Sequence, residues 1–193
     1  MTNSSNETAF TIDTSSIKFG PGITSEAGYE LSRLGATRVL VVTDPQLASS
    51  PAVQTAIDSL KKANIDHAVF DQVSVEPTDS SLKQAIKFAM EGRFDGFLPV
   101  GGGSSIDTAK AANLYSTYPA EFLEYVNAPI GKGTPVPGDL KPLVAVPTTA
   151  GTGSETTGVA IFDYEELGAK TGIAHRSLRP DVGLVDPENT RSL

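Results

Sequence analysis

The segment from Phe97 to Tyr115 constrains the fold of this chain more than any other part of it. An apolar run, FLPV, leads into three glycines at 101–103, and a helix-like stretch follows from Ala109 to Tyr115. A strand, a glycine turn and a helix in this order present free backbone N–H groups to an anion, and glycine lets that backbone approach closely and adopt positive φ. We interpret the segment as a phosphate-binding loop for a dinucleotide. The spacing is neither GxGxxG nor that of a P-loop, so the glycines alone fit an ordinary turn equally well.

Strand-like and helix-like segments alternate on both sides of this loop. Short apolar runs typical of buried strands occur at 38–43, 67–70, 97–100, 143–146, 159–163, 171–175 and 182–185. Between them, one helix opens at Ser50-Pro51, and another carries an apolar stripe from Leu82 to Met90 and should stop at Gly92. The alternation predicts an α/β fold, with a doubly wound, mainly parallel sheet and helices on both faces.

The region from Ser116 to Pro142 interrupts the alternation with five prolines and three glycines. We expect a short helix near 121–126 and then a surface loop. Asp186-Pro187 is typical of the opening of another helix. Residues 1–16 are expected to form a flexible or edge segment, and residues 17–193 one dinucleotide-binding domain cut from a longer protein.

Composition excludes several classes of function. The net charge of −8 argues against nucleic acid or an anionic membrane surface as a partner, and no apolar run is long enough for a membrane span. Because the chain has no cysteine and only two histidines, His67 and His175, a transition-metal site within it would have to be rich in carboxylates. We interpret both histidines as structural or surface residues. Residues 1–8 lack the features of a secretory signal or a transit peptide, so a cytoplasmic protein is expected.

Asp44 follows the strand-like run at 38–43, at the edge of the sheet where ligands of such folds bind. Its carboxylate is suited to accept two hydrogen bonds from a ribose and to repel a 2′-phosphate, which favours NAD over NADP. The alternative is a turn residue of the Asp-Pro dipeptide.

Three motifs together resemble the iron-containing (group III) alcohol dehydrogenase family: GGGSSIDTAK at 101–110, VPTTAGTGSETT at 146–157 and KTGIAHRSLRPDVGLVDP at 170–187. The segments VEPTD at 75–79 and APIGKG at 128–133 are similar to the hydroxyacid–oxoacid transhydrogenase branch. The resemblance runs through nearly the whole chain from about Ile17 onward.

The resemblance implies the NAD-binding domain of a metal-dependent oxidoreductase that moves hydride between a nicotinamide and an alcohol or hydroxy acid. The family's metal ligands, one aspartate and three histidines, lie in a C-terminal helical domain that has no counterpart here. Fe²⁺ or Zn²⁺ would therefore be bound only through that domain, and the 193-residue chain alone should be inactive. Apolar surface bared by the missing domain would favour a homo-oligomer. The alternatives are a non-catalytic nucleotide-binding module and a relative of glycerol dehydrogenase or dehydroquinate synthase.

The resemblance also implies site residues. The pyrophosphate cradle would consist of Gly101, Gly102, Gly103, Ser104 and Ser105, with Asp107 and Lys110 close to it. Contacts to phosphate and to the nicotinamide ribose would come from Thr148, Thr149, Thr152 and Lys170. Each has a plainer interpretation: Asp107 as a first-turn acid that complements the helix dipole, the threonines as turn caps, and Lys170 as a solvated charge. Glu76 stands where the family more often has asparagine, and a second carboxylate there would strengthen the preference for NAD.

Overall fold

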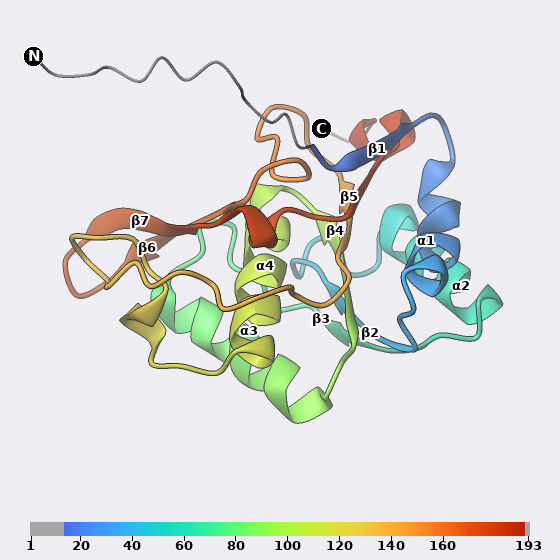
Figure 1. Ribbon diagram of the computed structural model, residues 1–193. Coiled ribbons are helices and arrows are strands. Elements are labelled where there is room, and N and C mark those ends of the chain that lie inside the picture. Colours follow the sequence, from blue (N-terminus) through green and yellow to red (C-terminus); the bar gives the residue numbers. More distant parts are fainter. Residues whose placement is uncertain (1–13, 192–193) are drawn as a thin grey trace, which may run out of the picture.

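A six-stranded parallel sheet forms the centre of the molecule. The computed structural model describes residues 14–191. The sheet has the strand order β1-β8-β5-β4-β2-β3, and each neighbouring pair is parallel (Figure 1). Its strands are β1 (Ser16–Phe19), β2 (Arg38–Val42), β3 (Asp66–Phe70), β4 (Gly96–Gly101), β5 (Val144–Pro147) and β8 (Val182–Val185). Two further strands, β6 (Val159–Tyr164) and β7 (Ala169–Ala174), pair with each other as an antiparallel hairpin.

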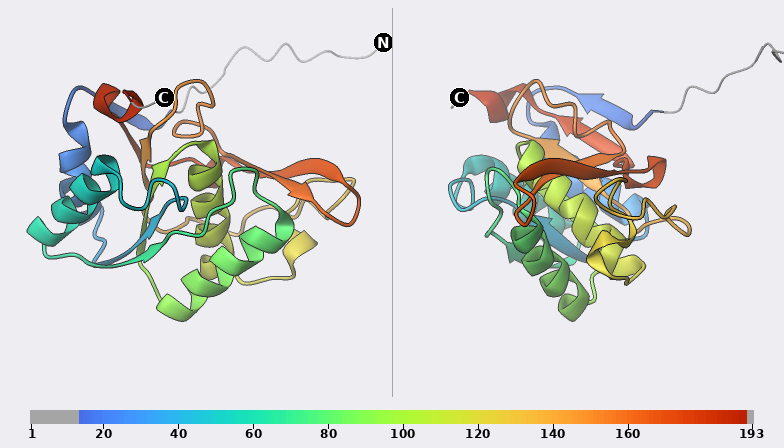
Figure 2. Two further views of the ribbon diagram at one scale, coloured as in Figure 1. Left: turned by 180° about the vertical axis from the view of Figure 1, so that it is seen from behind. Right: turned by 90° about the vertical axis from the view of Figure 1, so that its left-hand side faces the viewer.

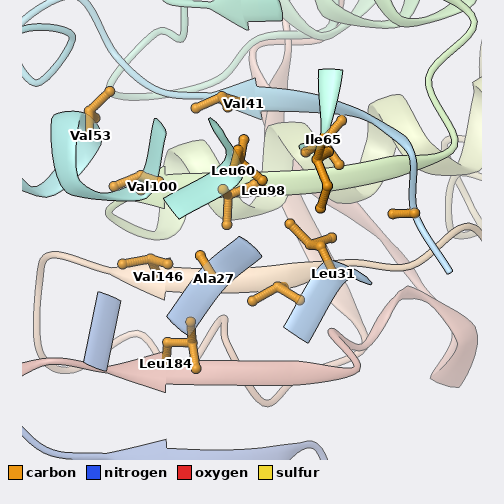
Figure 3. Close-up of a cluster of buried hydrophobic side chains, with 14 of the residues drawn as sticks. Ala27, Leu31, Val41, Val53, Leu60, Ile65, Leu98, Val100, Val146 and Leu184 are labelled. Carbon is orange, nitrogen blue, oxygen red and sulfur yellow. The ribbon is translucent and has the colours of Figure 1, made fainter. Parts of the chain in front are cut away.

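Helices cover both faces of the sheet, as predicted. On one side lie α1 (Ala27–Arg33) and α2 (Pro51–Lys62), and on the other α3 (Asp79–Gly92) and α4 (Gly103–Thr117) (Figures 1 and 2). Alternate residues of each strand point to opposite faces, so Val39 and Val41 join the cluster under α1 and α2, whereas Leu40 and Val42 pack under α3 and α4. Figure 3 shows part of the first cluster, in which Val41 and Leu98 face the side chains of α1 and α2.

The starts of α2 and α3 follow from their sequence. The Ser50 hydroxyl accepts from the Val53 amide at 3.3 Å, and Pro51 is the first helical residue. Thr78 caps α3 together with Ser81. Helix α3 ends at Gly92, as predicted, and the next residue, Arg93, adopts the left-handed conformation with φ of 51°. Because the aromatic ring of Phe94 lies 2.1 Å from where a Cβ of residue 92 would be, packing requires glycine there.

Helix α4 begins earlier than the sequence predicts. It starts at Gly103 rather than near Ala109, so the serines and Asp107 of the motif lie inside the helix. The segments near 122 and 187 are 3-10 turns rather than longer helices: η2 (Phe122–Glu124) and η4 (Pro187–Thr190). Two more, η1 (Ile23–Glu26) and η3 (Arg176–Leu178), were not predicted.

The N-terminal segment is only partly described. Of the expected flexible or edge segment at 1–16, residues 1–13 lie outside the described part, and Ser16 begins the edge strand β1. Within residues 14–191, no helix has the length and apolar character to cross a membrane.

Candidate cofactor-binding site

The predicted site residues meet at the carboxyl ends of β2, β4 and β5. Asp44 follows β2, the glycines follow β4, and Thr148 follows β5. A cavity of about 300 Å³ lies between them, and we call it the first cavity. It is lined by Asp44, Gln46, Leu47, Val75, Gly102, Gly103, Ser104, Ser105, Thr148 and Thr149.

A second cavity of about 290 Å³ adjoins the first, and the two share Val75, Gly103 and Ser104. Its other lining residues are Glu76, Pro77, Asp107, Thr152, Ser154, Ile161 and Lys170. A third cavity, of about 330 Å³, shares Leu47 and Thr148 with the first and extends toward α2 and η4. Every predicted site residue except Gly101 and Lys110 therefore lines the first or the second cavity, and together the three cavities form a continuous row.

The start of α4 faces this row. Gly102 precedes the helix with φ of −74° and ψ of −172°, and no side chain of residues 14–191 caps the helix, whereas α2 and α3 are capped. None of residues 101–103 adopts the positive φ that glycine permits. Packing explains the glycines instead: a Cβ on Gly101 would lie 2.4 Å from the Ser105 Oγ, and one on Gly103 would lie 3.0 Å from a methyl of Thr152.

The hydroxyl of Ser104 is engaged within the protein. It donates to the backbone carbonyl of Val75, 29 residues away. Ser104 therefore holds the segment after β3 against the start of α4, at the junction of the first two cavities. Ser105 is buried beneath Gly101. The amides at the start of α4 and the Ser105 hydroxyl, rather than the Ser104 hydroxyl, are the donors that remain for an anion.

Asp44 combines the two roles that its sequence context allows. Its Oδ1 accepts from the amides of Gln46 at 2.9 Å and Leu47 at 3.1 Å, which is a turn role. Its Oδ2 accepts no hydrogen bond from residues 14–191 and is half-buried beside the first cavity. Glu76 is placed differently, because it lines the second cavity with Lys170.

The threonine loop after β5 is the part of the site where glycine conformation matters. Gly151 and Gly153 have φ of 125° and 66°, in the region that other residues rarely adopt. The Thr148 amide donates to the Gly101 carbonyl at 3.0 Å, which fixes the two loops side by side. Thr152 Oγ1 accepts from the Ser154 amide at 3.3 Å, so it also has the predicted turn-capping role.

Lys170 reaches the second cavity from the hairpin. It lies directly opposite Asp163 in the β6–β7 register, and its Nζ is 3.0 Å from the Asp163 Oδ1. The Lys170 side chain is 62% exposed, so it is a solvated charge, as the plainer interpretation has it, that also pairs with Asp163. The two histidines lie outside the lining of the first and second cavities. His175 accepts from the Ser177 amide through Nδ1, and His67 lies in β3.

Asp107 differs most from its prediction. It lies in the second turn of α4, so it is not a first-turn acid. Its Oδ2 accepts from the Ile161 amide at 3.0 Å, and its Oδ1 lies 3.5 Å from the Nζ of Lys110. Burial raises the pKa of Asp107 and lowers the pKa of Lys110, while each charge opposes the shift of the other. The resemblance places Lys110 close to the loop but does not pair it with Asp107, although a spacing of three in one helix indicates such a pair.

Metal ligands are not gathered in this part of the protein. Among residues 14–191, no group of three or more His, Cys, Asp or Glu side chains is placed to hold a metal ion. The described residues therefore do not fit an iron or zinc site.

The chain is similar in sequence to hydroxyacid-oxoacid transhydrogenases. The chain is 60% identical over 183 residues to the mitochondrial hydroxyacid-oxoacid transhydrogenase of Bos taurus, and this match covers 94% of the chain and 39% of that protein. It is 55% identical over 194 residues to the enzyme of the same name from Xenopus tropicalis, covering 100% of the chain and 42% of that protein. The chain thus spans about two fifths of the length of these relatives.

Solved structures share the fold. NADH-dependent butanol dehydrogenase A from Thermotoga maritima superposes with a TM-score of 0.87 at 27% identity, over 96% of the chain and 46% of that protein. Sulfoacetaldehyde reductase from Bifidobacterium kashiwanohense, solved in complex with NAD⁺, gives 0.84 at 28% identity, over 96% of the chain and 48% of that protein. These neighbours confirm the predicted fold class.

The expected cytoplasmic location is wrong, because the transhydrogenases at 55–60% identity are mitochondrial proteins. The composition of residues 1–8 is therefore no guide to the compartment.

The family model for iron-containing alcohol dehydrogenase matches residues 14–187, which is almost all of the described part. The match includes all three motifs on which the resemblance depends, at 101–110, 146–157 and 170–187. It favours this family over the glycerol dehydrogenase or dehydroquinate synthase alternative. The chain belongs to the iron-containing alcohol dehydrogenase family.

Proposed function

We propose that this chain is the NAD-binding domain of an oxidoreductase that transfers hydride between a nicotinamide and an alcohol or hydroxy acid. The observation that carries the proposal is the uncapped start of α4 at the carboxyl edge of a parallel sheet, facing a row of three cavities. Parallel α/β sheets bind ligands at this edge, and the positive end of a helix stabilises a pyrophosphate. The NAD⁺ complex of the sulfoacetaldehyde reductase supports the same cofactor here.

Different residues of the site would bind different parts of the cofactor. The amides after Gly102 would bind the pyrophosphate, and the free Oδ2 of Asp44 would accept from a ribose hydroxyl. Thr149 and Thr152 border the glycines on the side of the threonine loop, and Lys170 would bind near the nicotinamide ribose. Val75 is 70% exposed at the junction of the first two cavities and would supply apolar contact.

Calorimetric titration of the chain with NAD and NADP tests this assignment. We expect weak binding of NAD and weaker binding of NADP, because the Asp44 carboxylate would repel a 2′-phosphate. Failure to bind NAD, both by this chain and by a form extended to the length of its relatives, would refute the cofactor assignment.

The activity of the whole protein is a further proposal. We propose a mitochondrial hydroxyacid–oxoacid transhydrogenase, because relatives at 55–60% identity carry this name. Hydride would pass from the carbinol carbon of a hydroxy acid to bound NAD⁺, and then from NADH to the carbonyl carbon of an oxo acid. Fe²⁺ or Zn²⁺ and the substrate would be bound through a further part of the longer protein, so residues 1–193 alone would not turn over.

The assay compares two substrate sets on the extended protein. One is 4-hydroxybutyrate with 2-oxoglutarate and no added NAD, and the other is a simple primary alcohol with NAD. Turnover of the acid pair supports the transhydrogenase, whereas turnover of the alcohol alone refutes it. Metal-dependent turnover by residues 1–193 would refute the placement of the metal outside this chain.

A further inference from the structure

The β6–β7 hairpin is a separate two-stranded unit beside the main sheet (Figure 1). One edge of β6 pairs with β7, and its other edge faces the helices α3 and α4. A strand edge of this kind carries backbone N–H and C=O groups that need partners. The position of the hairpin therefore depends on what these groups bind.

Charged side chains, rather than another strand, bind much of this edge. The Val159 carbonyl accepts from the Lys110 Nζ at 2.8 Å, and the Ile161 amide donates to the Asp107 Oδ2 at 3.0 Å. Further along, the Asp163 amide donates to the Pro77 carbonyl at 2.8 Å. The Glu165 amide donates to the Asp79 Oδ1 at 3.1 Å. Every second residue of the edge is thus held by α4 or by the start of α3.

The chemistry of Asp107 and Lys110 makes this contact directional. Of the two backbone groups on a strand edge, a carboxylate can accept only from N–H and an ammonium can donate only to C=O. The pair therefore opposes a slip of β6 by one residue, which would turn these groups away from α4. Lys110 has no exposed surface, and Asp107 is 7% exposed. Burying two charges is costly, and apolar side chains of similar volume would often give equal stability. The charged pair hydrogen-bonds to the backbone of β6 and so positions the hairpin, whereas apolar side chains would make no such bonds.

The placement matters because the hairpin carries part of the cofactor site. Ile161 lines the second cavity, and Asp163 orients Lys170 into it. Helix α4 starts at the pyrophosphate loop and, in its second turn, holds the strand that positions Lys170. We propose that Asp107 and Lys110 are positioning residues, which hold the hairpin so that Lys170 meets the cofactor bound at the start of α4. The inference rests on the proposed NAD function.

The main variant is Lys110→Met, because Lys110 does not line the first or second cavity. Asn113→Ala is the matched control. Asn113 is also buried on α4 and holds the backbone of Lys141 through its side chain, with no bond to the hairpin. Asp107→Asn is a milder second variant, since it removes the charge and keeps an acceptor for Ile161. If Lys110→Met does not fold, the same measurements on Asp107→Asn test the proposal.

Two measurements on the full chain test the proposal. Amide hydrogen exchange should accelerate at Ile161 and along 159–174 in the Lys110 and Asp107 variants, and not in Asn113→Ala. The dissociation constant for NAD should rise about tenfold in Lys110→Met, an effect typical of coupled neighbouring groups. When Lys170→Met is already present, adding Lys110→Met should change the dissociation constant for NAD by less than about twofold, because the effects of coupled residues are not additive.

Three results would overturn the proposal. The first is that amide exchange of the hairpin is unchanged in the Lys110 and Asp107 variants, and the second is that exchange accelerates but NAD affinity stays the same. The third is that Lys110→Met weakens NAD binding as much in the presence of Lys170→Met as in its absence. The last result would indicate that the pair acts on NAD without Lys170. If the unaltered chain and its extended form do not bind NAD, the proposed function fails, and the exchange data still show whether the two residues hold the hairpin.

Discussion

Gly102→Val should abolish NAD binding while leaving the fold nearly intact. The backbone of Gly102 has φ of −74° and ψ of −172°, which any residue adopts. A Cβ there would lie 3.3 Å from the nearest atom, the Thr149 Oγ1, so the neighbour needs to move only slightly. The branched side chain would instead occupy the space in front of the helix amides. A stability loss of about 1 kcal/mol or less is expected, because Gly102 is only half-buried and the substitution introduces no backbone strain.

The loss of binding follows from the bonds that the side chain blocks. A pyrophosphate bound to two amides of the first turn would make two charge-assisted hydrogen bonds, each contributing about 1.5 kcal/mol or more. Losing both weakens binding by about 3 kcal/mol, which is more than a hundredfold in Kd. Calorimetry with NAD should then show no heat of binding, while urea unfolding should change little.

Gly20→Val is the matched control. Gly20 follows the edge strand β1, no atom lies within 4 Å of where its Cβ would be, and it lines none of the three cavities. This variant should bind NAD as the unaltered chain does. Binding by Gly102→Val within about twofold of the unaltered chain would refute the assignment of the pyrophosphate to this helix, because the blocked bonds predict a far larger loss.

Three further predictions follow from other residues. Asp44→Ala should weaken NAD binding and narrow the preference for NAD over NADP, measured as the ratio of the two dissociation constants; an unchanged ratio would remove Asp44 from the ribose site. Thr78→Ala should lower the free energy of unfolding by about 1 kcal/mol through loss of the α3 cap, and no loss in urea titrations would contradict the capping role. Asp186 accepts from the amides of Gly22 and Thr24, and hydrogen bonds hold its pKa below the ordinary value of 3.8 despite burial. Its contribution is therefore complete above that value and is lost as pH falls through the lower folded-state pKa, so the stability difference from Asp186→Asn should shrink below about pH 4. A difference that stays constant down to about pH 2 would show that the charge of Asp186 has no part in it.

The sequence predicts the elements whose signals are local. The central strands are runs of apolar residues buried on both faces, and α2 and α3 have apolar stripes with capping residues at their starts. The edge strand β1 has mostly exposed residues, with Phe19 73% exposed, and α1 is only seven residues long. Neither carries enough local pattern to predict it.

The start of α4 could not be predicted from the sequence for a different reason. Residues 105–115 are buried all round, so the helix has no polar face and no amphipathic period. Its first residues are the same glycine and serines that the sequence suggests are a loop. A helix covered on every side is recognisable only once the sheet, α3 and the hairpin are placed around it.

In the candidate site, too, features with a local sequence signal could be predicted, whereas contacts between distant segments could not. Strand ends and glycines predict where the candidate cofactor site lies, and the structure brings those residues together around the first and second cavities. The partner of Asp107 is an amide 54 residues away in the sequence, and Lys110 is a residue type that is rarely buried. Contacts between distant segments of this kind have no signature in a single sequence.

Helix α4 links the fold of this domain to its proposed chemistry. Its N-terminus faces the cavities, its middle is enclosed by the sheet, α3 and the hairpin, and its buried ion pair holds β6. Because no face of the middle is free, the helix cannot shift without disturbing packing on several sides. The donors at its start are therefore fixed relative to both Asp44, which lines the first cavity, and Lys170, which lines the second. For the proposed function, a rigid central helix of this kind would hold the groups that bind the two ends of the dinucleotide in place before the cofactor arrives, and this would reduce the entropy lost on binding.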